Sequence, residues 1–180
     1  MQDGRKRFAL SFSNKQVRME DKLSWKEKMA AFMVLMIGTG YLMLTLLSFV
    51  SSKADMFTVS SENISISKAE FLSNLRSILY VIIGILGGVL LFRRKTLGWI
   101  MGVPLLSIFL VLVGFGLYYY IEVGEISFMS ISVAVTLLLF MLSLLFLLLP
   151  SARKKYKVSK MSFLLTLLFL VFLVVFNFVL

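Results

Sequence analysis

Residues Ile126 to Ala152 read ISFMSISVAVTLLLFMLSLLFLLLPSA, which is 27 consecutive residues without a charged side chain. The basic cluster Arg153-Lys154-Lys155 follows immediately. A helix needs about 20 apolar residues to cross the hydrocarbon core of a bilayer, which is about 30 Å thick. The stretch is long enough for one crossing, and we predict a transmembrane helix over residues 127–149.

The same pattern recurs in both directions along the chain. Residues 29–52, 96–121 and 161–180 form uncharged runs of 24, 26 and 20 residues. Residues 77–92 form a run of only 16, but the arginines at its two ends can extend their side chains to the headgroups. We therefore predict an all-α membrane protein that is a bundle of five transmembrane helices. The predicted helices cover residues 29–50, 74–92, 97–121, 127–149 and 161–180.

The composition excludes several classes of protein. Hydrophobic residues make up 59% of the 180 residues and charged residues 16%, whereas soluble domains have about 45–50% and about 25%. The chain has no Cys and no His, which excludes disulfides, thiolate nucleophiles and metal sites built from these two residues. We expect no cofactor and no metal.

The distribution of Lys and Arg predicts the orientation. Sixteen of the 19 cations lie in the N-terminal tail, in the turn 93–95 and in the segment 153–160, which alternate crossings place on one side. Basic residues favour the cytoplasmic side, so we predict a cytoplasmic N-terminus and a C-terminus outside. Residues 1–28 are then a basic cytoplasmic tail, and residues 29–180 are a single transmembrane bundle.

The segment between the first two helices is the largest predicted outer loop. Apolar residues alternate with polar ones over residues 57–66, which favours a short β-like hairpin, with an irregular loop as the alternative. The following Ser67-Lys68-Ala69-Glu70 is typical of a capping box and predicts that the second helix begins near Lys68.

Two pairs of glycines indicate where helices pack closely. Gly84 and Gly88 are four residues apart in the second predicted helix, as are Gly98 and Gly102 in the third. Such spacing lets two membrane helices approach closely. Because a short turn joins these two helices, we expect them to pack against each other as an antiparallel hairpin; self-association of two chains is the alternative.

Polar side chains within the spans are few. Ser132, Thr136 and Ser143 share one face of the fourth helix, where they can bond to a neighbouring helix or line a polar pore. We expect water to satisfy Asn177 near the outer end of the last helix. Trp99 lies at the inner end of the third helix and fits an aromatic belt at the membrane surface.

Two basic clusters follow directly on membrane helices. We predict that they contact anionic lipid on the cytoplasmic side or an acidic partner, whereas nucleic acid is a poor fit because the clusters are short and adjoin the bilayer. The residues concerned are Arg93, Arg94, Lys95, Arg153, Lys154 and Lys155.

The predicted spans contain no Asp, Glu, Lys or Arg, apart from Arg76 near the start of the second. Intramembrane charges mark proton relays and ion-coupled transport, so their scarcity argues against both. Glu122 and Glu125 are the one close pair of outer carboxylates, and Gly124 between them indicates a tight turn rather than a catalytic pair.

These observations lead to an expectation of function. We expect a non-enzymatic, multi-pass protein of the plasma membrane, with a bacterial inner membrane as the default. It would act through protein partners or self-association, as an accessory subunit, scaffold or sensor. The alternative is a homo-oligomeric channel or a membrane-perturbing effector.

Overall fold

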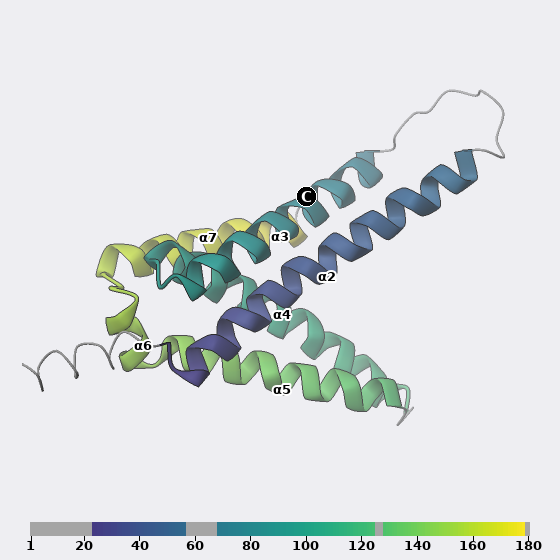
Figure 1. Cartoon of the computed structure of the whole chain (residues 1–180). Helices are drawn as coiled ribbons and strands as arrows, with labels where there is room; N and C mark the ends of the chain where they lie inside the picture. The colour runs from purple at the N-terminus through teal and green to yellow at the C-terminus, as the bar shows by residue number, and fades with distance from the viewer. Residues whose placement is uncertain (1–22, 57–67, 125–127, 179–180) are drawn as a thin grey trace, which may run out of the picture.

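The computed structural model describes residues 23–56, 68–124 and 128–178, and every secondary-structure element within these ranges is a helix (Figure 1). Five of the helices are long and apolar enough to cross a membrane, which confirms the predicted number of helices with that length and composition. The helices are α2 (Trp25–Met56), α3 (Lys68–Phe92), α4 (Thr96–Glu122), α5 (Phe128–Leu148), the short α6 (Pro150–Lys155) and α7 (Lys160–Phe178).

Two helices begin several residues before the predicted spans do. α2 begins at Trp25, so residues 25–28 of the predicted tail are helical, and α3 begins at Lys68, where the capping pattern placed the start of the second helix. The predicted β-like loop over residues 57–66 lies outside the described residues, as do residues 1–22 of the tail.

Pro150 divides the segment that follows the fourth span. Leu149 is extended, with φ −57° and ψ 141°, because the ring of the following proline disfavours a helical conformation at this residue. Pro150 then occupies the first turn of α6, where its missing N–H costs nothing. The sequence analysis did not predict α6, which turns the chain between α5 and α7.

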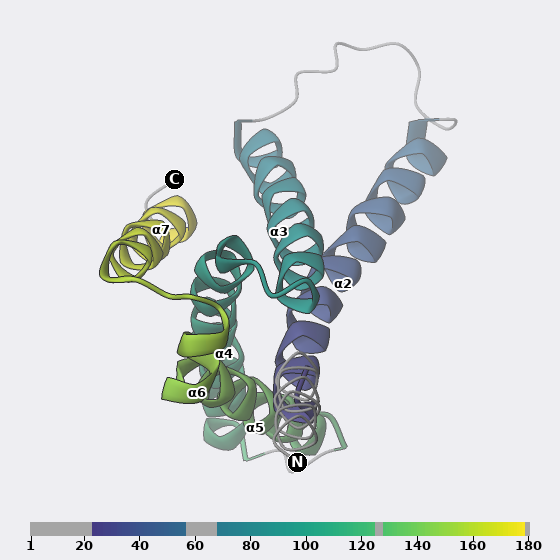
Figure 2. The ribbon, with the colours of Figure 1, turned by 60° about the vertical axis from the view of Figure 1, so that its left-hand side comes forward.

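The bundle is closed at one end and open at the other. α4 contacts α3, α5 and α7, and α2 contacts both α3 and α5. Figure 1 shows α2 and α3 diverging from α4 and α5 with distance from α6, and Figure 2 shows α7 across α4 from α2. Several side chains near α6 are completely buried, namely Ala30, Ala31, Leu91, Trp99, Leu147 and Tyr156.

An aromatic cluster joins the helices nearer the middle of the bundle. Tyr80 lies 5.0 Å from Tyr41 and 5.4 Å from Phe109, measured between ring centroids, and Phe140 extends the cluster through Phe109. Asn177 of α7 donates hydrogen bonds to the Tyr80 hydroxyl and to the Leu173 carbonyl. The expectation that water satisfies Asn177 was therefore wrong, because the fold brings a tyrosine from α3 to it.

Candidate functional site at the basic end

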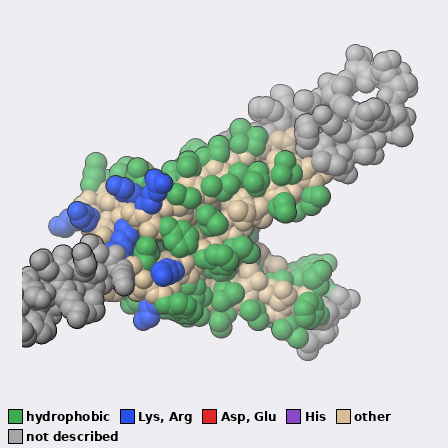
Figure 3. Space-filling view, viewed as in Figure 1, with side chains coloured by type: hydrophobic (Ala, Val, Ile, Leu, Met, Phe, Trp, Pro, Cys, Tyr) green, Lys and Arg blue, Asp and Glu red, His purple; other side chains and the backbone are tan. Residues whose placement is uncertain are grey.

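The closed end of the bundle carries most of the described charge, and we call it the basic end. Three segments meet there: the start of α2, the α3–α4 turn and the chain from α6 to the start of α7. Figure 3 shows Lys and Arg side chains gathered at this end and apolar side chains over the rest of the visible face. The ten cations are Lys26, Lys28, Arg93, Arg94, Lys95, Arg153, Lys154, Lys155, Lys157 and Lys160.

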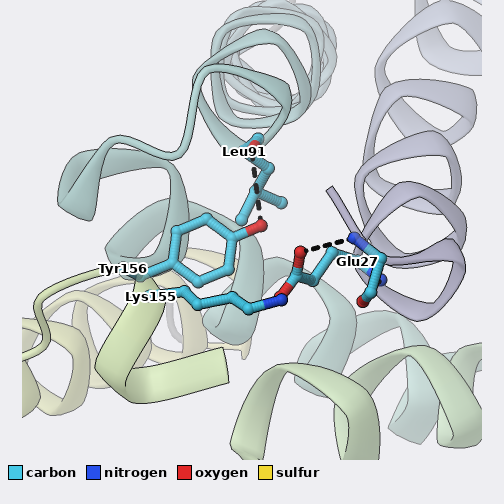
Figure 4. A network of polar contacts seen from close by, with 5 residues as sticks. Glu27, Leu91, Lys155 and Tyr156 are labelled. Atoms are coloured by element: carbon cyan, nitrogen blue, oxygen red, sulfur yellow. Dashed lines mark hydrogen bonds and ion pairs between the residues drawn. The ribbon is translucent and has the colours of Figure 1, made fainter. Parts of the chain in front are cut away.

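Glu27 is the one acidic residue that the structure describes within this end, and it is buried, with 4% of its surface exposed. Its carboxylate accepts a hydrogen bond from the Ser24 backbone N–H at 2.9 Å, and the Ser24 hydroxyl accepts one from the Glu27 N–H at 3.4 Å. This reciprocal pair is a capping box, and it begins α2. The other carboxylate oxygen lies 3.1 Å from Lys155 Nζ (Figure 4). The ion pair therefore ties α2 to α6.

Tyr156 connects the segment after α6 to the α3–α4 turn. Its ring is completely buried, and its hydroxyl donates to the Leu91 carbonyl at 3.2 Å (Figure 4). Its own carbonyl accepts a hydrogen bond from the Thr96 hydroxyl at 2.9 Å. Burial raises the pKa of the Tyr156 hydroxyl, and the Glu27 carboxylate raises it further, whereas Arg94 acts in the opposite direction. The hydroxyl therefore keeps its proton and remains a donor.

Trp99 is part of the interior rather than of an aromatic belt. It is completely buried in α4, and its indole N–H donates to the Leu147 carbonyl of α5 at 2.9 Å. A buried indole needs such an acceptor, and carbonyls in the last turn of a helix lack an intrahelical partner. The belt interpretation was therefore wrong for Trp99, whereas Trp25 is 72% exposed, as a residue at the membrane surface would be.

Both basic turns hold a cation in the left-handed region of backbone conformation. Arg94 has φ 53° and Lys157 has φ 52°. The N–H groups of Lys95 and Val158 bond to carbonyls five residues earlier, so each turn closes its helix with a Schellman motif. Glycine is the residue that fits this position at least cost. The two turns thus place positive charge at the ends of α3 and α6 despite a local conformational cost.

The four glycines predicted to mediate packing all face other helices, but the two pairs do not face each other. Gly84 lies against Gly38 of α2, and Gly88 lies against Leu35 of the same helix. The pair in α4 faces α3 instead, since a methyl group added at Gly98 or Gly102 would contact Leu91. In this fold α2 of the same chain therefore covers the groove of α3, and Gly38 is the partner that the sequence analysis missed.

The six predicted contact cations differ in how they are held. Arg93, Lys95, Arg153 and Lys154 are exposed, whereas Arg94 is half-buried and Lys155 is committed to Glu27. The fold brings the two predicted clusters to the same end of the bundle, where Tyr156 joins them through Leu91 and Thr96.

The hydroxyl residues predicted to share one face of α5 differ in how far they are buried. The Thr136 hydroxyl donates to the Ser132 carbonyl of its own helix at 2.8 Å, and Ser132 is exposed. Ser143 is completely buried among the helices. Within the described ranges, no three His, Cys, Asp or Glu side chains come together as they would to hold a metal ion.

No protein-family model matches this chain, and comparisons with curated proteins and with solved structures found no significant match.

The sequence analysis missed three residues on which this site depends: Glu27, Tyr156 and Thr96. Ser24-Trp25-Lys26-Glu27 has the capping-box spacing, so the local role of Glu27 was readable in the sequence. Its pairing with Lys155 was not, because 127 residues separate the two in the chain. Tyr156 lies among cations, where nothing in the sequence distinguishes a buried tyrosine from one at the membrane surface.

Proposed function

We propose that this chain is a non-enzymatic protein of the plasma membrane whose basic end lies in the cytoplasm and binds an acidic surface of a partner protein. It would serve as an accessory or scaffold subunit. The observation that carries the proposal is the charge at this end, where eight of the ten cations are exposed and the one described carboxylate is buried and paired with Lys155. The positive charge of these eight side chains therefore lies at the surface of the described part of the fold.

Two features of the site support this proposal. Cations at one end of a membrane bundle are retained on the cytoplasmic side during insertion, which favours the proposed orientation. The cations also stand on a framework held by Tyr156, Trp99 and the Glu27–Lys155 pair. A framework of this kind reduces the ordering cost of binding, since the charged turns are already in place.

The orientation can be tested by labelling, because the natural chain has no cysteine. Lys154→Cys and Glu122→Cys each introduce one exposed thiol, at opposite ends of the bundle. A membrane-impermeant maleimide applied to intact cells should label Glu122→Cys at once and Lys154→Cys only after permeabilisation. Labelling of Lys154→Cys in intact cells would reverse the orientation and with it the proposed partner side.

Partner binding can be tested with a pair of exposed cations in the α3–α4 turn. The full chain, tagged and expressed at its native level, is cross-linked in native membranes, purified and examined by mass spectrometry. Replacing Arg93 and Lys95 with Gln should lower the recovery of a stoichiometric partner about tenfold, the combined effect of two exposed ion pairs. The control exchanges the same charges, Arg93→Lys with Lys95→Arg, and should retain most of the recovery. Isolation of the wild-type chain as a lone monomer after cross-linking would contradict the proposal.

A further inference from the structure

A pocket of about 350 Å³ opens where the chain leaves α6 and enters α7. Arg153, Val158, Ser159, Lys160 and Phe163 line it. The lining thus combines two cations and a hydroxyl with two apolar side chains. Its volume is at the lower end of the range of small-molecule sites, which is about 300–1,000 Å³.

Hydrogen bonds hold the backbone of the turn that carries the two cations. The Val158 N–H donates to the Arg153 carbonyl at 3.0 Å, and the Lys157 N–H donates to the Lys154 carbonyl at 3.1 Å. The adjoining Tyr156 is buried and anchored to α3 and α4. The backbone that carries the polar rim of the pocket is therefore held in place before any ligand binds.

The charge of this rim is not neutralised by neighbouring described residues. Glu27 is occupied by Lys155, and Glu122 lies at the far end of α4. Ser159 caps α7 and accepts a hydrogen bond from the Ser162 N–H at 3.2 Å, so the positive end of the helix dipole adds to the two cations. The pocket therefore favours an anion.

The apolar side of the pocket points to a ligand that also has hydrocarbon. Phe163 is 51% exposed, and its ring centroid lies 6.4 Å from that of the buried Trp99. Leu164 and Leu167 continue the exposed apolar surface along the membrane-spanning part of α7. An anion held at the rim would have its non-polar part directed along this surface, into the bilayer.

We propose that this pocket binds one anionic phospholipid, with the phosphate between Arg153 and Lys160 and the start of an acyl chain against Phe163. A free phosphate offers the same charge, but it would leave the apolar side of the pocket unused. The inference deepens the proposed function, because it adds a lipid to the partners of the basic end. Its test needs neither a protein partner nor a known orientation.

The test is native mass spectrometry of the full chain released from nanodiscs that contain equal amounts of phosphatidylglycerol and phosphatidylcholine. The wild-type chain should retain one phosphatidylglycerol in preference to phosphatidylcholine. Arg153→Gln with Lys160→Gln should lower this retention about tenfold or more, as expected when two cations near the membrane surface are removed. Arg153→Lys with Lys160→Arg keeps both charges and should keep the lipid, and thermal melting of each variant shows that it is folded.

The matched control is Arg93→Gln with Lys95→Gln, which removes one Arg and one Lys from the same end but outside the pocket. It should change lipid retention by about twofold at most, because neither side chain lines the pocket and both are exposed, so that solvent and salt weaken their effect on it. The same control lowers partner recovery in the function test, so a failure of either proposal is distinguishable from a failure of the other.

Three results would overturn the lipid site. Equal loss of phosphatidylglycerol in the two neutralised variants would mean that diffuse charge, not the pocket, attracts the lipid. Equal retention of phosphatidylcholine by the wild-type chain would mean that the headgroup is not selected. Displacement of phosphatidylglycerol by millimolar inorganic phosphate would identify a site for a small anion.

Discussion

Gly38→Ala is expected to push α2 away from α3 and to destabilise the chain by about 2–3 kcal/mol, the upper part of the range for overpacking. A methyl group at Gly38 would lie 2.6 Å from the Ile85 backbone nitrogen and 2.7 Å from the Gly84 carbonyl carbon. These are backbone atoms, so no change of rotamer can relieve the contact. The crossing of two helices at this point depends on glycine in both of them, and Gly84→Ala should act in the same way.

Gly40→Ala is the matched control in the same helix, because a methyl group there meets no atom within 4 Å. It should leave stability unchanged or increase it by up to about 1 kcal/mol, since alanine forms helix more readily than glycine. Titration with a denaturing detergent, followed by circular dichroism, measures both variants. Equal stability of Gly38→Ala and Gly40→Ala would contradict the close contact between α2 and α3.

The second large effect concerns the two partners of the buried ion pair, which should respond unequally to replacement. Lys155→Met leaves the Glu27 carboxylate buried without its cation and is expected to cost about 3 kcal/mol or more. Glu27→Gln should cost only about 1–2 kcal/mol, because Gln still accepts the hydrogen bond from Ser24. Lys155, with 33% of its side chain exposed, can then turn to water.

The double variant, Glu27→Gln with Lys155→Met, separates the pair from other effects of the two replacements. It should be more stable than Lys155→Met alone, because no unpaired carboxylate remains in the interior. The same detergent titration provides the four stabilities of a double-mutant cycle. Strictly additive costs would show that Glu27 and Lys155 contribute independently, and that α2 and α6 are not coupled through this pair.

The candidate site was only partly predictable from the sequence. Arg93 and Lys154 could be assigned to a shared cationic end from the sequence. Each uncharged run between clusters predicts one membrane crossing, and two crossings separate these residues, so they lie on the same side. The different roles of Lys155 and Arg153 could not be predicted, because adjacent cations look alike in the sequence. Lys155 pairs with Glu27, whereas Arg153 lines a pocket. Trp99 shows the same limit: at the start of a membrane helix, a tryptophan fits an aromatic belt and a buried hydrogen bond equally well.

The sequence predicted that helices pack closely at these glycines, but it did not predict which helix packs against which. The spacing of Gly84 and Gly88 indicates a groove, and the short connection to the next helix favoured α4 as the occupant. The structure places α2 there instead, because Gly38 lets that backbone approach, while α4 uses Gly98 and Gly102 to approach the end of α3. A lone glycine such as Gly38 gives no spacing signal, so the choice between neighbours depended on the shapes of the complete helices.

The number and approximate extent of the membrane helices were determined by the sequence alone, as was the separation of cations from apolar runs. The reason is that the free energy of transferring a side chain into hydrocarbon depends mainly on the side chain itself. It can therefore be summed residue by residue from the sequence. Only the tertiary structure decided that Tyr156 joins two basic turns, that Glu27 neutralises Lys155 and that a pocket forms beside Phe163. Those features depend on which surfaces of distant segments fit together, and close packing is a property of the assembled helices rather than of any one of them.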